Sequence, residues 1–183
     1  MKILSSILLL LATAEAYQTA SSRRDVFRSV ASAAFVGVIP AAANAIEACP
    51  KGSNNCIRTT WTPPAGTSKS DAASQIKTIL ESYPQEGQEK VDLGGWSFAS
   101  DSLASSGTAS VEYKSGIGNF AKFLNGGKPF VDDLVVEVGD DGTAQVRSSS
   151  RVGDSDFKVN QKRLEFFATK LTAAGWTAPA PAY

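Results

Sequence analysis

The sequence predicts an α+β domain in which a single antiparallel sheet of three to five strands carries two helices packed on one face. Two observations support this fold class. Apolar residues recur three and four positions apart over residues 71–83 and 155–174, which is typical of amphipathic helices. Between these segments, apolar and polar residues alternate in stretches separated by glycine-rich turns, which is the pattern of half-buried strands.

The first helix is expected from Asp71 to Tyr83. Ser70 is suited to cap its N-terminus, and Pro84 cannot continue it. A glycine-rich segment follows the helix. We expect a strand there over residues 91–99, broken or bulged at Gly94-Gly95.

Three further strands are expected before the second helix. Residues 108–115 alternate between polar and apolar types. After a loop with at most a helical turn at 120–124, strands at 130–138 and 144–149 form a hairpin around the turn at 139–142. The apolar side chains of the last helix are Leu164, Phe167 and Leu171, with Asp154 to Asp156 as its cap and Gly175 at its end.

Residues 1–45 resemble targeting segments rather than a folded domain. Residues 1–16 have an early lysine, a short apolar core and a small-residue exit, as a secretory signal peptide does. Residues 17–45 contain the pair Arg23-Arg24, a weakly apolar run and an A-x-A cleavage pattern, which together are typical of a twin-arginine export signal.

Two signals in series resemble the bipartite leader of algae with complex plastids of red-algal origin, in which an aromatic residue such as Tyr17 opens the transit segment. We therefore expect transport to the plastid thylakoid lumen and removal of about 45 residues. Retention of residues 30–45 as a membrane anchor stays open as an alternative. The remaining chain divides into an N-terminal arm at 46–69, an α+β domain at 70–177 and a tail at 178–183. We expect the arm to be an extended loop, because it is rich in Pro, Gly, Ser, Thr and Asn and lacks any period, with Ile57 and Trp61 docking onto the domain.

The charge balance argues against a nucleic-acid partner. Residues 46–183 carry 14 Lys and Arg against 16 Asp and Glu, and they show no basic face and no aromatic-basic interleaving. The oligomeric state stays unknown at this level.

The two cysteines, Cys49 and Cys56, lie close together at the start of the arm. In an exported protein such a pair predicts a disulfide, and in a reducing compartment a metal or redox pair. Structural zinc needs about four ligands, and this chain has no histidine; the spacing is also not C-x-x-C. The sequence therefore favours a disulfide and predicts no metal site and no cofactor.

The absence of histidine removes histidine-based triads, general bases and metal ligands from the catalytic choices. Asp132 and Asp133 are adjacent in an expected strand, so their side chains should point to opposite faces and cannot serve one site as a pair. Asp140 and Asp141 fit the chemistry of a tight turn. We therefore expect no enzyme activity, and a carboxylate-using enzyme stays open as a third alternative.

A polar cluster around residues 147–163 offers two interpretations. Its arginines, serines and helix N-terminus suit an anion such as a phosphate or carboxylate. Alternatively, the arginines pair with aspartates of the protein itself. The two aspartates at the helix start favour this second interpretation, because their negative charges repel an outside anion. The candidate residues are Arg147, Ser148, Ser150, Arg151, Asp156, Asn160, Arg163, Asp132 and Asp133.

Three segments resemble the DUF1499 family, and together they span about residues 48–176. The matching positions are Cys49, Pro50, Asn55 and Cys56; Phe130, Asp132 and Asp133; and Arg147, Ser148, Ser150, Arg151, Gly153, Asp156, Asn160 and Arg163. Asp154 departs from the family pattern, which often has an aromatic residue there. The family is a domain of unknown function, so the resemblance implies membership without an activity.

The leading functional expectation is a non-catalytic accessory or assembly protein of the thylakoid lumen. Its expected partner is a photosystem or another thylakoid membrane complex, with peripheral membrane association allowed. The alternative is a small-anion or small-ligand binding domain that uses the Arg147, Arg151 and Arg163 cluster.

Overall fold

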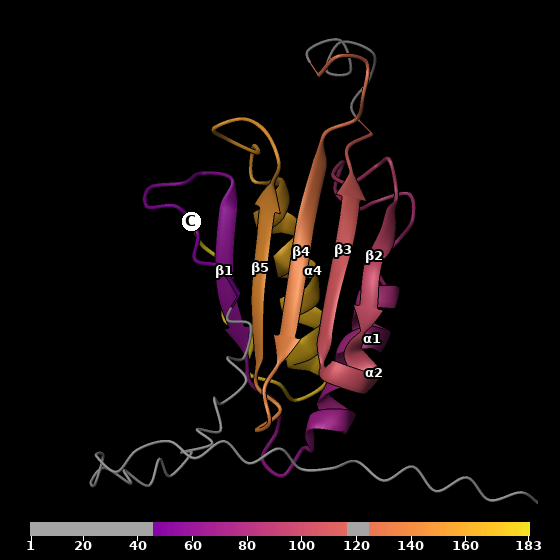
Figure 1. Cartoon of the computed structure of the whole chain (residues 1–183), viewed down its shortest axis with the longest axis vertical. Helices are drawn as coiled ribbons and strands as arrows, with labels where there is room; N and C mark the ends of the chain where they lie inside the picture. The colour runs from indigo at the N-terminus through magenta and orange to yellow at the C-terminus, as the bar shows by residue number, and fades with distance from the viewer. Residues whose placement is uncertain (1–45, 117–124) are drawn as a thin grey trace, which may run out of the picture. The chain divides into compact units, whose positions relative to one another are not determined.

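A five-stranded antiparallel sheet is the centre of the fold, in the order β1-β5-β4-β3-β2 (Figure 1). The computed structural model describes residues 46–116 and 125–183. The strands are β1 Cys56–Trp61, β2 Trp96–Ser102, β3 Thr108–Lys114, β4 Val131–Val138 and β5 Ala144–Ser150. The helices of the described residues are α1 Lys69–Glu81, α2 Leu103–Ser106 and α4 Val159–Ala173.

The two long helices, α1 and α4, lie on the same face of the sheet (Figure 1). The other face carries no helix of the described residues, and we call it the open face. The core therefore fills the space between one sheet face and the helices. Strand residues contribute at every second position, as the alternating burial of β3 and β4 shows. The core includes Ile57, Trp61, Val111, Tyr113, Leu134, Val136 and Val146 from the sheet, Ile76 and Leu80 from α1, and Leu164, Phe167 and Leu171 from α4. This arrangement confirms the predicted fold class.

The N-terminal arm is not a loop throughout, which corrects the expectation for residues 46–69. It contains β1, which pairs antiparallel with β5 and forms one edge of the sheet. Ile57 and Trp61 are buried, as expected of docking residues. Cys49 and Cys56 form a disulfide that closes the arm just before β1, so the predicted bond is confirmed.

The expected strand at 91–99 lies later in the chain, as β2 at Trp96–Ser102. Gly94 approaches the backbone oxygen of Lys114 so closely that a Cβ would lie 2.9 Å from it. Residues 88–95 form turns before β2, with mutual backbone hydrogen bonds between Gln88 and Val91, and Gly94 and Gly95 each share a backbone hydrogen bond with Lys114. The irregularity in pairing falls between Phe98 and Ser100 rather than at the glycines.

The helices also begin at other residues than expected. Ser68, not Ser70, caps α1: its hydroxyl oxygen accepts from the backbone N–H of Asp71. The last helix begins at Val159 rather than at 155, because residues 151–158 form a loop that ends in two residues with positive φ. The helical turn expected at 120–124 lies outside the described residues. Within the described part of the chain, no helix is long and apolar enough to cross a membrane.

Candidate functional site

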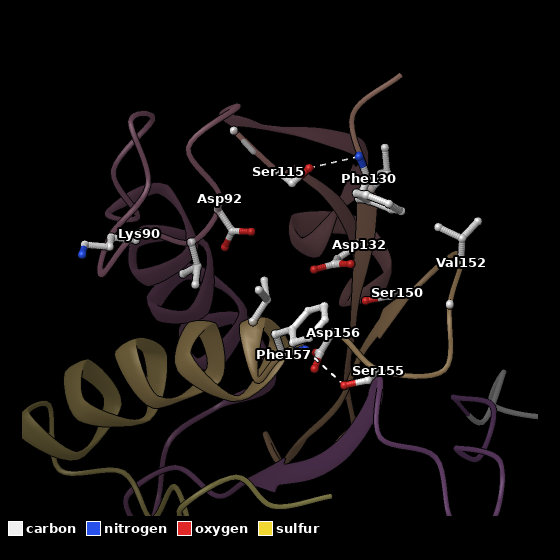
Figure 2. A pocket seen from close by; sticks show the side chains of 15 residues that line it. Lys90, Asp92, Ser115, Phe130, Asp132, Ser150, Val152, Ser155, Asp156 and Phe157 are labelled. Atoms are coloured by element: carbon white, nitrogen blue, oxygen red, sulfur yellow. Dashed lines mark hydrogen bonds between the residues drawn. The ribbon is translucent and has the colours of Figure 1, made fainter. Parts of the chain in front are cut away.

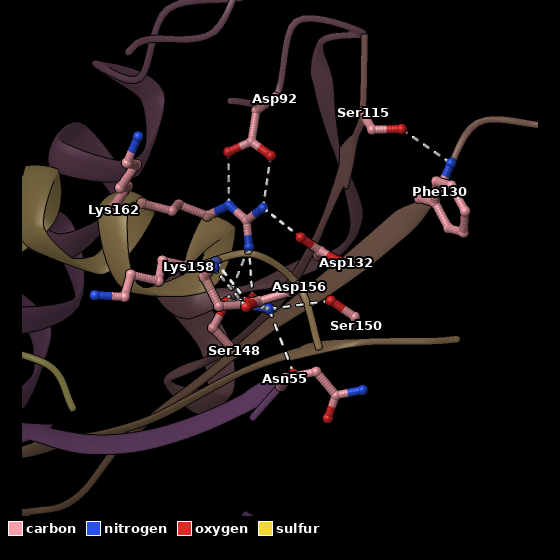
Figure 3. Close-up of polar contacts among 12 residues, drawn as sticks. Asn55, Asp92, Ser115, Phe130, Asp132, Ser148, Ser150, Asp156, Lys158 and Lys162 are labelled. Atoms are coloured by element: carbon pink, nitrogen blue, oxygen red, sulfur yellow. Dashed lines mark hydrogen bonds and ion pairs between the residues drawn. The ribbon is translucent and has the colours of Figure 1, made fainter. Parts of the chain in front are cut away.

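A buried arginine, Arg163 on α4, is the centre of a polar network in the interior. Figure 3 shows the members of this network, among them Asp92, Asp132 and Ser148. The side chain of Arg163 is 0% exposed. It forms a bidentate ion pair with Asp92, in which Nε donates to Oδ2 at 2.8 Å and Nη2 donates to Oδ1 at 2.5 Å. Nη2 also donates to Asp132 at 2.7 Å. Nη1 donates to Ser148 at 3.0 Å and to Asn160 at 2.8 Å. These five contacts match the five N–H groups of a guanidinium, so no donor remains for an outside anion.

The surroundings of Arg163 keep it charged. Burial acts to lower the pKa of its guanidinium, but the hydrogen bonds and charges of Asp92 and Asp132 outweigh burial and raise that pKa. The ring of Tyr113 lies 4.2 Å from the guanidinium carbon and adds a cation–π contact. Tyr83 donates its hydroxyl to Asp92 at 2.7 Å, and burial followed by the charge of Asp92 raises the pKa of Tyr83.

A second polar network holds the start of α4. Asp156 accepts from the backbone N–H groups of Lys158 and Asn160, both at 2.9 Å. The amide of Asn160 donates to Asp156 at 2.6 Å and to Ser150 at 3.2 Å. The hydroxyl of Tyr183, in the tail, also donates to Asp156 at 2.5 Å. Asp156 thus binds backbone N–H groups at the start of α4 from the loop before it, whereas the N-cap position of this helix is Lys158.

The other two arginines lie on the open face of the sheet. Arg151 donates to Asp133 at 2.8 and 2.7 Å and also pairs with Glu112, as one member of an exposed ion-pair group. Arg147 pairs with neither Asp132 nor Asp133; its nearest carboxylate is Glu47 at 4.0 Å. Arg147, Arg151 and Arg163 therefore do not converge on one site, because strand alternation and the helix place them on opposite sides of the sheet.

A pocket of about 220 Å³ lies beside the start of α4, the start of β4 and the end of β5 (Figure 2). We call it the α4 pocket. Its polar lining includes the carboxylates of Asp92, Asp132 and Asp156, and its apolar lining includes Val91, Phe130, Val152, Phe157 and Val159. Figure 2 shows the carboxylates of Asp92 and Asp132 pointing towards the same hollow as the ring of Phe157. The Arg163 network thus forms one side of this pocket.

Unusual backbone conformations cluster at the same place. The described residues include five non-glycine residues with positive φ, and three of them line the pocket: Lys90 at 67°, Asp92 at 55° and Phe157 at 54°. The other two, Glu89 and Lys158, are their chain neighbours. Such conformations are uncommon, cost about 1–3 kcal/mol each and tend to occur at binding or switching sites.

Sequence reasoning found part of this site and missed the rest. It named Asp132, Ser150, Asp156 and Arg163, but not Asp92 or the apolar residues around the pocket. Asp92 carries no periodic signal, because it lies in a turn between the first helix and β2. Phe157 offered one signal, since it is the one aromatic residue of a loop in which Val152 is the other large apolar residue.

The lining of the α4 pocket combines apolar side chains with carboxylates and serine hydroxyls. Across residues 46–116 and 125–183, no group of three or more metal-ligating side chains is placed to hold an ion. The pocket contains serine hydroxyls, but the chain has no histidine to activate them. Arg163 holds Asp92 and Asp132, and the start of α4 holds Asp156, so the positions of the three carboxylates are fixed.

Comparison with known proteins gives one match. The family described as "Protein of unknown function (DUF1499)" matches residues 39–171, which include β1 to β5 and most of α4. No curated protein matches the chain, and no solved structure does.

Proposed function

Because the chain belongs to the DUF1499 family, whose function is unknown, we propose a role from its own geometry: a non-catalytic accessory protein that binds a small ligand or partner group in the α4 pocket. The observation that carries this proposal is the combination of an apolar pocket with a fixed charged lining. Ligand sites are concave, mostly apolar and supplied with a few oriented polar groups. The α4 pocket has all three properties.

The non-catalytic character is supported by how Arg163 and Asp92 are engaged. All five N–H groups of Arg163 donate to protein acceptors, and both carboxylate oxygens of Asp92 accept hydrogen bonds. A general acid or base needs a group that is free to exchange a proton with a substrate. Buried ion pairs of this kind instead hold their charges at fixed positions beside the pocket.

We place this protein in the thylakoid lumen, at a photosystem or another thylakoid membrane complex or in its assembly. The leader-like segments at 1–16 and 17–45 support this location. The Cys49–Cys56 disulfide adds support, because such bonds form and persist in oxidising compartments reached by export. The association with a membrane complex rests on the leader alone.

One isolation experiment tests both parts. The tagged full-length chain and its Phe157→Ser variant are expressed in a red-lineage alga, and each protein is recovered from fractionated thylakoids. The proposal expects both proteins in the lumen fraction. Native mass spectrometry should then detect a bound mass on the wild type that is absent from the variant. Recovery from the stroma or cytosol would overturn the location, and identical bare masses would overturn the binding role.

A further inference from the structure

We propose that the α4 pocket binds a small amphipathic amine, with the cationic nitrogen at Asp132 and the apolar body between Phe130, Val152 and Phe157. This inference rests on the proposed function, in that it names the chemistry of the ligand for the same pocket.

The charge of the pocket favours a cation. Its lining contains three carboxylates, those of Asp92, Asp132 and Asp156, and these are opposed by the single buried guanidinium of Arg163. Formally, two negative charges remain. Lys90 also lines the pocket, but its side chain is exposed to solvent, where its charge is screened.

Asp132 is the carboxylate with room for a new donor. Asp92 and Asp156 each accept hydrogen bonds at both oxygens. Asp132 accepts from Arg163 at Oδ2, and within the described residues no donor contacts its Oδ1. Its side chain is only 10% exposed, and it lines the pocket. A carboxylate oxygen that lines a pocket and has no protein donor can accept a charge-assisted hydrogen bond from the ammonium group of a ligand.

The apolar body of the ligand would cover side chains that are otherwise in water. Phe157 is 86% exposed and Val152 is 44% exposed, although both line the pocket. Large apolar side chains so exposed at the mouth of a cavity mark a contact surface. An aromatic ring there also attracts a cation through its face. The positive φ of Phe157 holds the ring at this position at a cost in backbone energy.

The size of the pocket restricts the ligand. A volume of about 220 Å³ is smaller than the ~300–1,000 Å³ of sites for drug-sized molecules. A single ring or short chain that bears one amine therefore fits better than an extended ligand. 2-Phenylethylamine is a suitable probe, with 2-phenylethanol and 3-phenylpropionate as neutral and anionic probes of similar shape.

Calorimetric titration of the disulfide-bonded protein, isolated from cells that express the full chain, tests the inference. We expect 2-phenylethylamine to bind at least tenfold more tightly than 2-phenylethanol, and 3-phenylpropionate to bind more weakly than either. Raising the salt concentration should weaken the binding of the amine and leave the binding of the alcohol almost unchanged, because only the amine is attracted by charge.

Two pairs of variants locate the binding. Phe157→Ala should weaken the binding of the amine about tenfold. Leu93→Ala should not change this affinity, because Leu93 is also an exposed apolar residue but does not line the pocket. Asp132→Asn should abolish the preference for the amine over the alcohol. Asp133→Asn is the matched control, because this neighbour also pairs with an arginine but faces the other side of the sheet. Phe157→Ala keeps the test valid if Asp132→Asn fails to fold, since Phe157 is outside the core.

The outcomes separate this inference from the proposed function. Equal or tighter binding of the alcohol or carboxylate, still sensitive to Phe157→Ala, would overturn the amine assignment and leave the pocket as a binding site. Failure of all three probes would also overturn the amine assignment. The proposed function would fail with it only if the protein recovered from thylakoids also lacks a mass that depends on Phe157.

Discussion

Asp132 and Asp133 are neighbours in β4, yet each holds a different arginine on a different side of the sheet. Asp132 contacts Arg163 in the interior at 2.7 Å, and Asp133 contacts Arg151 on the open face at 2.7 Å. The separation follows from strand geometry, in which successive side chains point to opposite faces. The two ion pairs have similar distances and different burial, so they allow a direct comparison of what burial does.

Arg163→Ala should destabilise the protein far more than Arg151→Ala. Removal of Arg163 leaves Asp92 and Asp132 buried without their partner, and breaking such a pair costs about 3–5 kcal/mol. The side chain of Arg151 is 46% exposed, where an ion pair contributes about 0–1 kcal/mol. Urea unfolding of both variants measures the difference. Losses of similar size would show that burial does not govern these pairs.

Asp156→Ala should lower the free energy of unfolding by about 1–2 kcal/mol, because it removes a cap from α4. The carboxylate accepts from two backbone N–H groups, from Asn160 and from Tyr183. Asp154→Ala is the matched control, since this aspartate is exposed in the same loop. Thermal unfolding of the two variants provides the measurement, and an equal shift in both would contradict the role of Asp156.

Reduction of the Cys49–Cys56 disulfide should destabilise the protein by about 2 kcal/mol, because it releases a short loop of the arm. Intact mass after alkylation of the native protein, with and without prior reduction, counts the free thiols. We expect none before reduction and two after it. Two alkylated thiols in the unreduced native protein would exclude the bond and reopen a metal or redox role.

The tyrosines of residues 46–183 should resist ionisation while the protein is folded. Burial raises the pKa of Tyr83, Tyr113 and Tyr183, and the charges of Asp92 and Asp156 raise those of Tyr83 and Tyr183 further. An unfolded tyrosine has a pKa of about 10. The folded state therefore holds these protons more tightly, so their contribution to stability is complete below pH ~10 and is lost as the pH rises above it.

Tyrosinate absorbance and circular dichroism, followed together against pH in protein without its leader, test this expectation. We expect tyrosinate to appear at the pH where the fold is lost. Tyr183→Phe is the control, because it removes the one exposed tyrosine of this region. Three tyrosines that titrate near pH 10 with unchanged dichroism would contradict the burial of Tyr83 and Tyr113 and the contact of Tyr183 with Asp156.

A fluorescent fusion of residues 1–60 should enter the plastid of a red-lineage alga, because two signal-like segments lie in series. Arg23→Lys together with Arg24→Lys should block entry into the lumen and leave the fusion in the stroma. Protease protection in isolated thylakoids distinguishes the two places. Fluorescence in the cytosol from the fusion with the unmodified leader would rule out this localisation.

The local patterns of the chain predicted most of the elements, because each depends on residues that are close in sequence. Alternation placed the strands at 108–115 and 130–138 within one residue of β3 and β4. The glycine-rich turn at 139–142 gave the hairpin of β4 and β5, and alternation put Asp132 and Asp133 on opposite faces. The arm was predicted wrongly, because only Ile57 and Trp61 are apolar on the inward side of β1 and its period is too weak to recognise.

The sequence by itself determined the α+β class, the hairpin, the close cysteine pair and the aspartate at the start of the last helix. Tertiary structure alone decided the pairing of β1 with β5 and the contact of Arg163 with Asp92, which lies 71 residues away. The physical reason is that alternation, capping and turn chemistry act between residues a few positions apart. An ion pair between distant segments exists only after the sheet and α4 have brought them together, and the α4 pocket forms at that same meeting point.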